Sequence, residues 1–574
     1  MRALFYWLRR AALWALLLAC ATGSGAAPTT YFVATNGNDA WDGLAAAFTA
    51  GSNGPLATLH EAAQRMKAGD ATFVRGGFYN CTNYPRQYFD PRQNSVTLSN
   101  YPGEVPLFAN QRVNPKVLEL LSVSHLSGVR IFGLHATNCQ RTAGFYAVTN
   151  LELAYCDFGF SDTNYALNGM VQLSANSRTN WIHDNRLHDK QHDNVVPKQA
   201  DKGTPLLIGN GESVPSDVTA FNLIERNVLF RGGHDAIQIQ SSFNIIRSNW
   251  FHNEPWVWWD IYNQFGGHRC IDVEPRCQSN VIEDNWVAYA SLALANPSGN
   301  GMEICGSSNI VRGNAVVWCQ QVGILLYGTK DGTKPQDPQC CDNHVYNNTL
   351  AWNSLGQNFT TNRTNGFVKD YTGNKFVLQV NHGTNNVFVN NLLAFNGGNL
   401  WFKTPPNDHR FVACRERDNQ WGRQWRDNGD GDPKFVSRGT GVSTLVPGVR
   451  SQVGAKGVLV TGSPTDPPNS NINLHLRPDS PCLGAGEFLT KVTSESGSGR
   501  EFAVADALFF TDGYGLVPGD EIQLEGSRER MRLLHVDWRT RILTTDRPLS
   551  WTKGQKVALA YERARPDMGA FGPP

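Results

Sequence analysis

The middle of the chain carries two histidines, an arginine and several carboxylates at matching places in successive apolar segments. His234-Asp235 and His268-Arg269 each enter such a segment in the same register. Histidine exchanges protons near neutral pH, and an arginine beside it can stabilise a developing negative charge. The pattern favours acid–base chemistry on an anionic ligand, and we expect His234, Asp235, His268 and Arg269 to be catalytic.

Three acidic residues follow in the same segments. Asp272 and Glu274 alternate with apolar residues in 271–274, and Glu303 has the place of Asp272 in 302–305. Alternate residues of a strand face one side, and neighbouring parallel strands lie about 4.8 Å apart, so these carboxylates should share one exposed strip. Carboxylates at that spacing shift one another's pKa or bind a cation. We therefore predict a metal site at Asp272, Glu274 and Glu303, with Ca²⁺ as the cation.

One reaction that uses all these groups is β-elimination in a uronate-containing polysaccharide. It needs neutralisation of the uronate carboxylate, a base for the C5 proton and an acid for the leaving oxygen. Arg269 or Ca²⁺ would stabilise the enolate charge, and His234 or His268 would be the base. The residues thus predict an extracellular polysaccharide lyase, although a C5-epimerase uses similar parts.

Two other functions stay open. The backbones of Asp272 and Glu274 would lie roughly 6.6 Å apart on one face of a strand, which fits the carboxyl pair of an inverting glycoside hydrolase loosely. A non-catalytic surface protein would use the same outward residues, together with aromatic loops, only to hold a glycan. Residue types alone do not separate an enzyme from a binding protein.

Long insertions flank the acidic strip and supply candidate substrate-binding residues. Trp256, Trp258 and Trp259 lie in the insertion 252–267, where they can stack on sugar rings or pack the loop onto its support. Insertions in a solenoid collect on one face, often the binding face. Lys369, in 365–370, is a further candidate for substrate binding.

The elements that position these residues follow from a repeat. Asn, four residues, Asn recurs with an aliphatic or aromatic residue inside each pair, and the copies begin 22 to 43 residues apart. Such a period indicates a solenoid of short strands, in which stacked asparagines bond to the backbone and to one another at equivalent turns. The seven copies are 180–185, 222–227, 244–249, 280–285, 309–314, 343–348 and 386–391.

Both ends of the solenoid carry family-like motifs. Residues 31–34 alternate like a strand, 54–63 contain a short helix with Thr58 near its N-cap, and 68–79 form a strand and a turn. This block resembles the N-terminal cap of secreted right-handed parallel β-helix proteins of the pectate-lyase-like fold. Residues 432–436, 474–481 and 567–571 are similar to the closing motifs of that superfamily. The resemblance covers 31–486 and 563–574 and implies an all-β, right-handed parallel β-helix.

The resemblance does not extend to a particular activity. The sequence lacks the set of paired-Asp, Gly-His-Gly and Arg-x-Lys motifs of polygalacturonases. It also lacks the Asp-Pro-His-Asp of mannuronan epimerases and the Arg-x-Pro-x-x-Arg of common pectate lyases.

Residues 487–562 interrupt the solenoid pattern before its last segment. Short alternating runs separated by Gly and Pro turns predict a small inserted β-barrel, with 563–574 returning to close the β-helix. We expect an accessory role for it, in binding or in covering the end of the solenoid.

Residues 1–27 have the basic start, apolar run and small residues of an export signal. Cleavage would follow Ala21, or a lipobox would leave a lipid anchor on Cys20, so we expect a secreted, periplasmic or cell-surface protein. With 51 Lys+Arg against 50 Asp+Glu the chain is not a general nucleic-acid binder, and we expect a monomer with no transmembrane segment. Among 12 cysteines, Cys270 and Cys277 bracket a short loop and are the expected disulfide pair.

Overall fold

The computed structural model describes most of the chain from residue 27 onward. The described ranges are 27–81, 87–109, 119–139, 141–160, 169–190, 203–210, 216–232, 234–253, 269–290, 299–319, 321–328, 340–353, 377–381, 383–396, 420–421, 423–426, 430–438 and 472–574. No helix in these ranges is long and apolar enough to cross a membrane.

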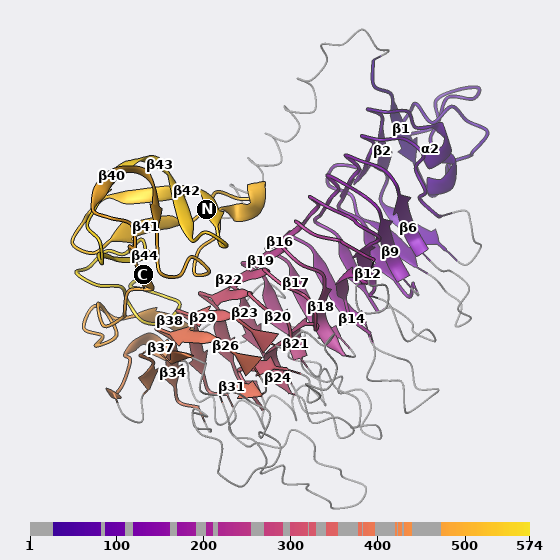
Figure 1. Cartoon of the computed structure of the whole chain (residues 1–574). Coiled ribbons are helices and arrows are strands. Elements are labelled where there is room, and N and C mark those ends of the chain that lie inside the picture. Colours follow the sequence, from indigo (N-terminus) through magenta and orange to yellow (C-terminus); the bar gives the residue numbers. More distant parts are fainter. Residues whose placement is uncertain are drawn as a thin grey trace, which may run out of the picture.

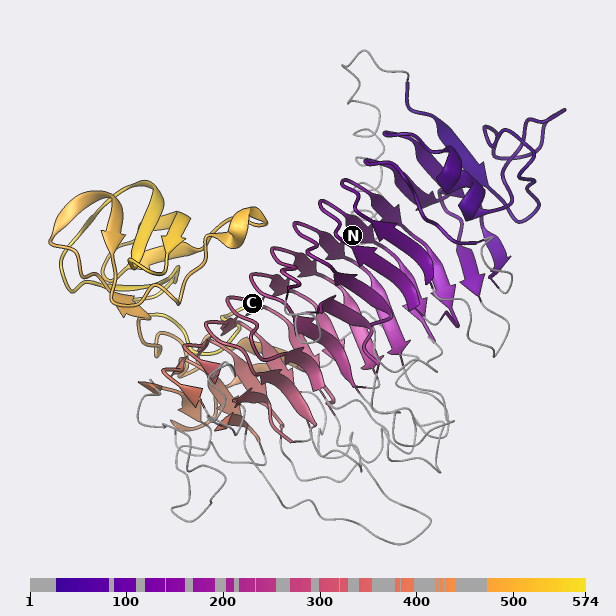
Figure 2. The same ribbon diagram turned by 45° about the vertical axis from the view of Figure 1, so that its right-hand side comes forward.

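Three long parallel sheets form the body of the molecule, with 13, 12 and 9 described strands. Each coil of the chain passes through the first, the second and usually the third sheet, and the next coil stacks on it, as Figures 1 and 2 show. The predicted right-handed parallel β-helix is thereby confirmed. Because every strand pairs with the equivalent strand of the next coil, register is carried along the whole stack.

The strands of the three sheets are short. The first sheet contains β1 (Thr30–Val33), β2 (Ala71–Val74), β4 (Thr97–Asn100), β7 (Arg130–Phe132), β10 (Glu152–Ala154), β13 (Trp181–His183), β16 (Leu223–Glu225), β19 (Ile245–Arg247), β22 (Val281–Glu283), β25 (Ile310–Arg312), β29 (His344–Tyr346), β33 (Val387–Val389) and β35 (Gln420–Trp421). The second contains β3 (Gly77–Asn80), β5 (Pro106–Ala109), β8 (His135–Thr137), β11 (Asp157–Gly159), β14 (Arg186–Lys190), β17 (Val228–Gly232), β20 (Trp250–His252), β23 (Trp286–Ala288), β26 (Ala315–Val317), β30 (Thr349–Ala351), β34 (Leu392–Ala394) and β36 (Trp425–Arg426). The third contains β6 (Glu119–Ser124), β9 (Arg141–Tyr146), β12 (Val171–Ser174), β15 (Leu206–Gly209), β18 (Asp235–Gln240), β21 (Arg269–Val273), β24 (Asn300–Ile304), β27 (Ile324–Tyr327) and β31 (Leu378–Asn381). A small pair, β28 (Cys340–Cys341) and β32 (Gly383–Thr384), lies at one corner.

The core is a column of apolar side chains inside the coils. On the third sheet, Ile237, Ile271, Met302 and Ile324 stack in register and are fully buried. These are the positions that the alternation of the sequence assigned to the interior. Burying them drives the coils together, because no coil can cover its apolar face alone.

The bracketing asparagines form two continuous ladders at the corners on either side of the first sheet. The Nδ2 of Asn180 donates to Oδ1 of Asn222 at 2.9 Å, and the Nδ2 of Asn222 donates to Oδ1 of Asn244 at 3.0 Å. The backbone N–H of each asparagine donates to the same oxygen, as at 3.1 Å from Asn222 to Asn244. The second ladder runs in the same way from Asn185 to Asn391 and ends on Gln424. The predicted ladder is therefore present.

The left-handed residue of each corner is the one before the asparagine. Phe221 has φ 56° and Arg226 has φ 55°, directly before Asn222 and Asn227. We had attributed the left-handed conformation to the asparagines themselves. The structure corrects this, because each asparagine must direct its amide into the stack to bond with the next coil.

Caps cover the ends of the solenoid. The helix α2 (Leu59–Arg65) begins after Thr58, whose hydroxyl accepts from the backbone N–H of Glu61 at 3.1 Å, and it buries Leu59, Ala62 and Ala63 on the first coils. At the other end the hairpin of β37 (Phe435–Arg438) and β38 (Ile472–Leu476) joins the last residues of the chain. Gly569 donates to the carbonyl of Asn390 at 2.8 Å, and a Cβ there would lie 2.8 Å from Thr349 Oγ1, so only glycine allows this approach.

The C-terminal insert is a six-stranded antiparallel sheet that rolls into a small barrel. It consists of β39 (Thr490–Lys491), β40 (Gly497–Ala503), β41 (Glu521–Leu524), β42 (Arg530–Asp537), β43 (Ile542–Trp551) and β44 (Lys556–Leu559), with the 3-10 turn η4 (Gly513–Gly515). An antiparallel bridge between Val492 and Val504 joins its outer strands. We call it the insert barrel.

The insert barrel docks on the first sheet, beside β22 and β25 (Figures 1 and 2). It covers an apolar row of that sheet, of which Ile245, Val281 and Ile310 are buried. A buried ion pair accompanies this contact, because the Arg312 guanidinium lies 2.6 Å from Oδ1 of Asp520 and 2.6 Å from Oε2 of Glu283. The contact therefore combines apolar burial with a charge pair of fixed geometry.

The expected disulfide between Cys270 and Cys277 is not present. Both thiols are free and donate to different backbone carbonyls, Cys270 to Ala288 at 3.1 Å and Cys277 to Ile239 at 3.4 Å. The prediction failed because proximity in sequence does not bring the two side chains together across a strand and a corner. The other cysteines in the described ranges are also free.

The ladder predicts a large cost for one amide. In Asn280→Ala the buried N–H and Nδ2 of Asn244 lose the oxygen that accepts from both at 3.0 Å. A buried donor left without a partner costs about 1–3 kcal/mol. We expect a loss of at least about 2 kcal/mol in urea unfolding, whereas Gln278→Ala, at an exposed position of the same coil, should change little. Equal midpoints for the two variants would contradict the role of the ladder.

The docking of the insert barrel predicts a second difference. Asp520→Ala leaves the Arg312 guanidinium buried with one partner fewer, and breaking such a pair costs about 3 kcal/mol or more. Glu562→Ala breaks an exposed pair with Arg530, which is worth about 0–1 kcal/mol. Limited proteolysis should release the insert barrel faster from the first variant only. Identical cleavage rates would show that the ion pair does not hold the barrel.

Candidate active site

The candidate site lies on the outward side of the third sheet, on the neighbouring strands β18, β21 and β24. Two rows of residues cross these strands in register. Asp235 pairs with Arg269 and Arg269 with Asn300, while Gln238, Asp272 and Glu303 form the other row. The sequence therefore placed Asp235 beside Arg269 and Asp272 beside Glu303 correctly.

A local irregularity brings the two rows to the same face. Ala236 and Ile237 are consecutive and both belong to the buried core, and so do Cys270 and Ile271. Strict alternation would direct residues three apart to opposite sides. Because two successive residues face inward here, Arg269 and Asp272 both face outward and form an ion pair of 2.7 Å.

Arg269 is the centre of the cluster. Its guanidinium contacts Oδ2 of Asp272 at 2.7 Å through Nη1 and Oε2 of Glu303 at 2.9 Å through Nε, and it lies 3.6 Å from Oδ1 of Asp235. The side chain of Arg269 is 15% exposed, while those of Asp272 and Asp235 are 2% and 0% exposed. The expected exposed acidic strip is thus a buried charge cluster.

Burial and crowding determine the protonation of this cluster. Burial raises the pKa of Asp272 well above its ordinary value, and the charges of Glu274, Asp235 and Glu303 add to the rise although Arg269 opposes it. Burial alone would lower the pKa of Arg269, but the charges of Asp272, Glu303 and Asp235 raise it well above its ordinary value. Asp272 is therefore a carboxyl group that can hold a proton near neutral pH beside a permanent cation.

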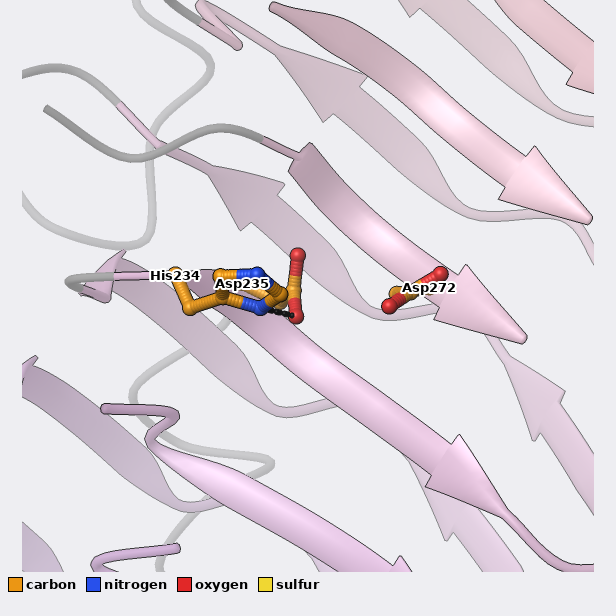
Figure 3. Close-up of side chains that lie close together, drawn as sticks. All are labelled: His234, Asp235 and Asp272. Atoms are coloured by element: carbon orange, nitrogen blue, oxygen red, sulfur yellow. Dashed lines mark hydrogen bonds and ion pairs between the residues drawn. The ribbon is translucent and has the colours of Figure 1, made fainter. Parts of the chain in front are cut away.

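His234 and Asp235 form a dyad at the start of β18. Nδ1 of His234 is hydrogen-bonded to Oδ2 of Asp235, and Figure 3 shows this pair facing Asp272 on the neighbouring strand. Burial lowers the pKa of His234, but the charge of Asp235 and its hydrogen bond outweigh this, so that the pKa is raised. With 25% of its side chain exposed, His234 is the most accessible member of the cluster.

Two asparagines that the sequence analysis did not select support the cluster. Nδ2 of Asn253 donates to the backbone carbonyl of Arg269 at 2.6 Å. Nδ2 of Asn300 donates to Oε2 of Glu303 at 2.9 Å, the oxygen that also accepts from Arg269. Asn300 could have been found from the sequence, because Asn300 and Glu303 repeat the spacing of Arg269 and Asp272. Asn253 follows a strand of the second sheet and has no such signal.

The cluster offers two sets of possible cation ligands. His234, Asp235 and Asp272 bring one ligand atom each within 4.8 Å of one another, and so do Asp272, Glu303 and Cys305. Calcium takes about 6–8 oxygen ligands, whereas these sets include an imidazole and a thiol. The oxygens of Asp272 and Glu303 that face Arg269 already accept from it. The donors therefore do not fit calcium in this arrangement.

Glu274, the third predicted ligand, stands apart from both sets. It accepts a hydrogen bond of 2.5 Å from Nε2 of Gln238 and is partly exposed. Calcium at Asp272, Glu274 and Glu303 stays a prediction, and no chemical step proposed below depends on it.

Five predicted residues lie outside the described ranges. They are His268, Trp256, Trp258, Trp259 and Lys369. Their predicted roles in catalysis and substrate binding stay predictions. The described members of the predicted catalytic set, His234, Asp235 and Arg269, do come together.

Comparison with known proteins gives distant likenesses only. No protein-family model matches the sequence, and no curated protein matches it. Among solved structures, pectate lyase Pel9A is 13% identical with a TM-score of 0.43, over 83% of this chain and 95% of that one. The PL6 family polysaccharide lyase Pedsa3628 from Pseudopedobacter saltans is 17% identical with a TM-score of 0.40, over 65% and 91%.

A third solved structure, XylC in complex with xylose, is 13% identical with a TM-score of 0.38, over 93% of this chain and 100% of that one. These likenesses are too distant to carry an argument about activity. The fold rests on the three parallel sheets, and the chemistry rests on the cluster around Arg269.

The dyad predicts a titration that can be measured without a substrate. In Asp235→Asn the negative charge that raises the pKa of His234 is removed, while the amide can still bond to Nδ1. We expect the imidazole resonances of His234 to titrate at lower pH than in the unchanged protein, by NMR. As a control, Asp512→Asn, beside the exposed His535 of the insert barrel, should leave the His234 titration unchanged. An unaltered midpoint in Asp235→Asn would exclude the dyad.

Proposed function

We propose that this protein is a polysaccharide lyase that cleaves a uronate-containing glycan by β-elimination at the cluster around Arg269. The observation that carries the proposal is the His234–Asp235 dyad beside a guanidinium and a carboxyl group with a raised pKa. Together these groups provide a base, a fixed positive charge and a proton donor within three neighbouring strands.

His234 is the proposed base. With Nδ1 bonded to Asp235, Nε2 is the nitrogen that takes the proton from C5 of the uronate. The C5–H bond breaks, a C4–C5 double bond forms, and the C4–O bond of the glycosidic linkage breaks. The imidazolium then passes the same proton to the leaving oxygen, and Asp235 stabilises the imidazolium between the two transfers.

Arg269 and Asp272 act on the uronate carboxylate. Removal of the C5 proton places negative charge on that group, and a nearby guanidinium stabilises it. Asp272, when protonated, can donate a hydrogen bond to a carboxylate that would otherwise repel the acidic cluster. These two roles replace the neutralising cation that the sequence alone suggested.

Glycoside hydrolysis is the second candidate, because Asp272 and Glu303 face each other in register. Their nearest ligand atoms lie within 4.8 Å, which is closer to the about 5–5.5 Å of a retaining pair than to the about 6.5–9.5 Å of an inverting pair. The inverting pair expected from the sequence, Asp272 and Glu274, would need Glu274 to leave Gln238. C5-epimerisation and glycan binding without turnover remain further readings of the same residues.

Activity on a panel of polyuronates and neutral glycans separates these functions. Elimination produces unsaturated uronate ends, which absorb in the ultraviolet, together with reducing ends, whereas hydrolysis produces reducing ends alone. Epimerisation changes the uronate composition without cleavage. Chelator in a parallel reaction tests the predicted calcium, because the proposed mechanism keeps its rate when divalent cations are removed. Binding with no product of any kind would sink the enzyme proposal and favour a glycan-binding surface protein.

The roles of the residues predict two kinetic results. His234→Gln should lower kcat/KM by about 10²–10⁴-fold, because it removes the base, while His535→Gln in the insert barrel should be neutral. In the unchanged protein kcat/KM should rise with pH through the raised pKa of His234, since only the neutral imidazole accepts a proton. The rise should move to lower pH in Asp235→Asn. Wild-type activity in His234→Gln would remove His234 from the mechanism.

The expected secretion and the expected export signal at 1–27 stay predictions, since residues 1–26 lie outside the described ranges. An exported polysaccharide lyase would meet its polymeric substrate outside the cytoplasm, which is consistent with the proposal. Processing at Ala21 or Cys20 is measurable by mass spectrometry of the mature protein.

A further inference from the structure

The acidic residues around Arg269 differ in how many hydrogen-bond donors they receive. Oε2 of Glu303 accepts from two donors, Nε of Arg269 and Nδ2 of Asn300, each at 2.9 Å. Asp235 contacts both His234 and Arg269. Asp272 accepts from Arg269 alone among the described residues, at 2.7 Å.

A buried carboxylate keeps its negative charge only where donors compensate for the lost water. Three carboxylates around one guanidinium exceed its charge, so a proton on one of them lowers the repulsion. That proton goes to the carboxyl group with the fewest donors, because the others have more to lose when they become neutral. Asp272 is that group.

We propose that Asn300 is a positioning residue that assigns the shared proton to Asp272 by holding Glu303 in its charged form. The proposal deepens the function proposed above, on which its catalytic meaning rests. The location of the proton itself follows from the contacts and does not require a substrate.

Every charged or titratable group that faces Asp272 belongs to the same three strands or their entry. Arg269 and Glu274 come from the strand of Asp272, His234 and Asp235 come from β18, and Glu303 and Cys305 come from β24. Of these, only Glu303 contacts Asn300. A change at Asn300 therefore reaches Asp272 through Glu303 and not through the dyad.

Asn300 also occupies a place where a larger or charged side chain has no room to turn away. It is 2% exposed, its Oδ1 has no hydrogen-bond partner, and the next residue, Gly301, would bring a Cβ to 2.6 Å from the carbonyl of Gly323. The close approach of Gly301 fixes the backbone at this point. The amide of Asn300 is thereby held against Glu303.

Infrared spectroscopy of the ligand-free protein tests the assignment. A protonated carboxyl group has a C=O stretch that is separate from the bands of carboxylates and shifts in D₂O. In the unchanged protein near neutral pH, we expect Asp272→Asn to abolish one such band and Glu303→Gln to leave it. In Asn300→Ala, we expect the dependence to reverse, so that Glu303→Gln in that background abolishes the band and Asp272→Asn does not.

A matched control comes from the same sheet. Gln379→Ala removes a buried amide from β31, on the same outward row as Asp272 and Glu303, and should leave the band unchanged. Circular dichroism verifies folding of each variant, and Asn300→Ser serves as the replacement if Asn300→Ala does not fold. Asn300→Asp should trap a proton between the introduced carboxyl group and Glu303, and give a band that Glu303→Gln removes.

The outcomes separate this inference from the proposed function. A band that depends on Asp272 in both the unchanged protein and Asn300→Ala would overturn the role of Asn300, and so would a band that never depends on Asp272. Neither result bears on whether a glycan is cleaved. Conversely, absence of lyase activity would leave the infrared result as a property of the cluster.

Discussion

The stacking of one coil on the next through buried amides is the constraint on which the rest of the structure depends. An asparagine amide is both donor and acceptor, so each ladder residue bonds to the coil above and the coil below at once. The same oxygen accepts from the backbone N–H of its neighbour, which satisfies a donor that the corner would otherwise bury. The ladders therefore fix the height of each coil, while the number of residues between corners can vary.

This tolerance explains how reactive residues come to lie on a rigid surface. Brackets begin 22 to 43 residues apart, yet the strands of the third sheet keep their register across β18, β21 and β24. Insertions leave the stack between strands and return to it without disturbing the pairing. His234 and Arg269 accordingly sit at strand entries, next to long insertions, while their neighbours remain fixed by the sheet.

Two buried arginines show how the same side chain serves different ends. Arg312 joins Glu283 to Asp520 and accompanies the docking of the insert barrel on the first sheet. Arg269, on the third sheet, faces three carboxylates and is left with an excess of negative charge around it. The first arrangement is nearly balanced and suits a joint. The second leaves a proton to be placed, which suits a site where protons move.

The sequence by itself determined the architecture and the partners along each strand. The asparagine spacing predicted the coils, and the alternation in 271–274 and 302–305 placed Ile271 and Met302 inside and Asp272 beside Glu303. These are local patterns with a fixed period, so they can be counted without coordinates.

Only the tertiary structure decided how the site is arranged and charged. The two consecutive inward residues that bring Arg269 to the face of Asp272 break the period, so no alternation rule predicts them. The burial that raises the pKa of Asp272 depends on neighbouring coils, and the support of Arg269 by Asn253 comes from a different sheet. The free Cys270 and Cys277 show the same limit, because their separation is set by a corner and not by the residues between them. A repeating chain fixes its register locally, but the charge of a group is a property of everything packed around it.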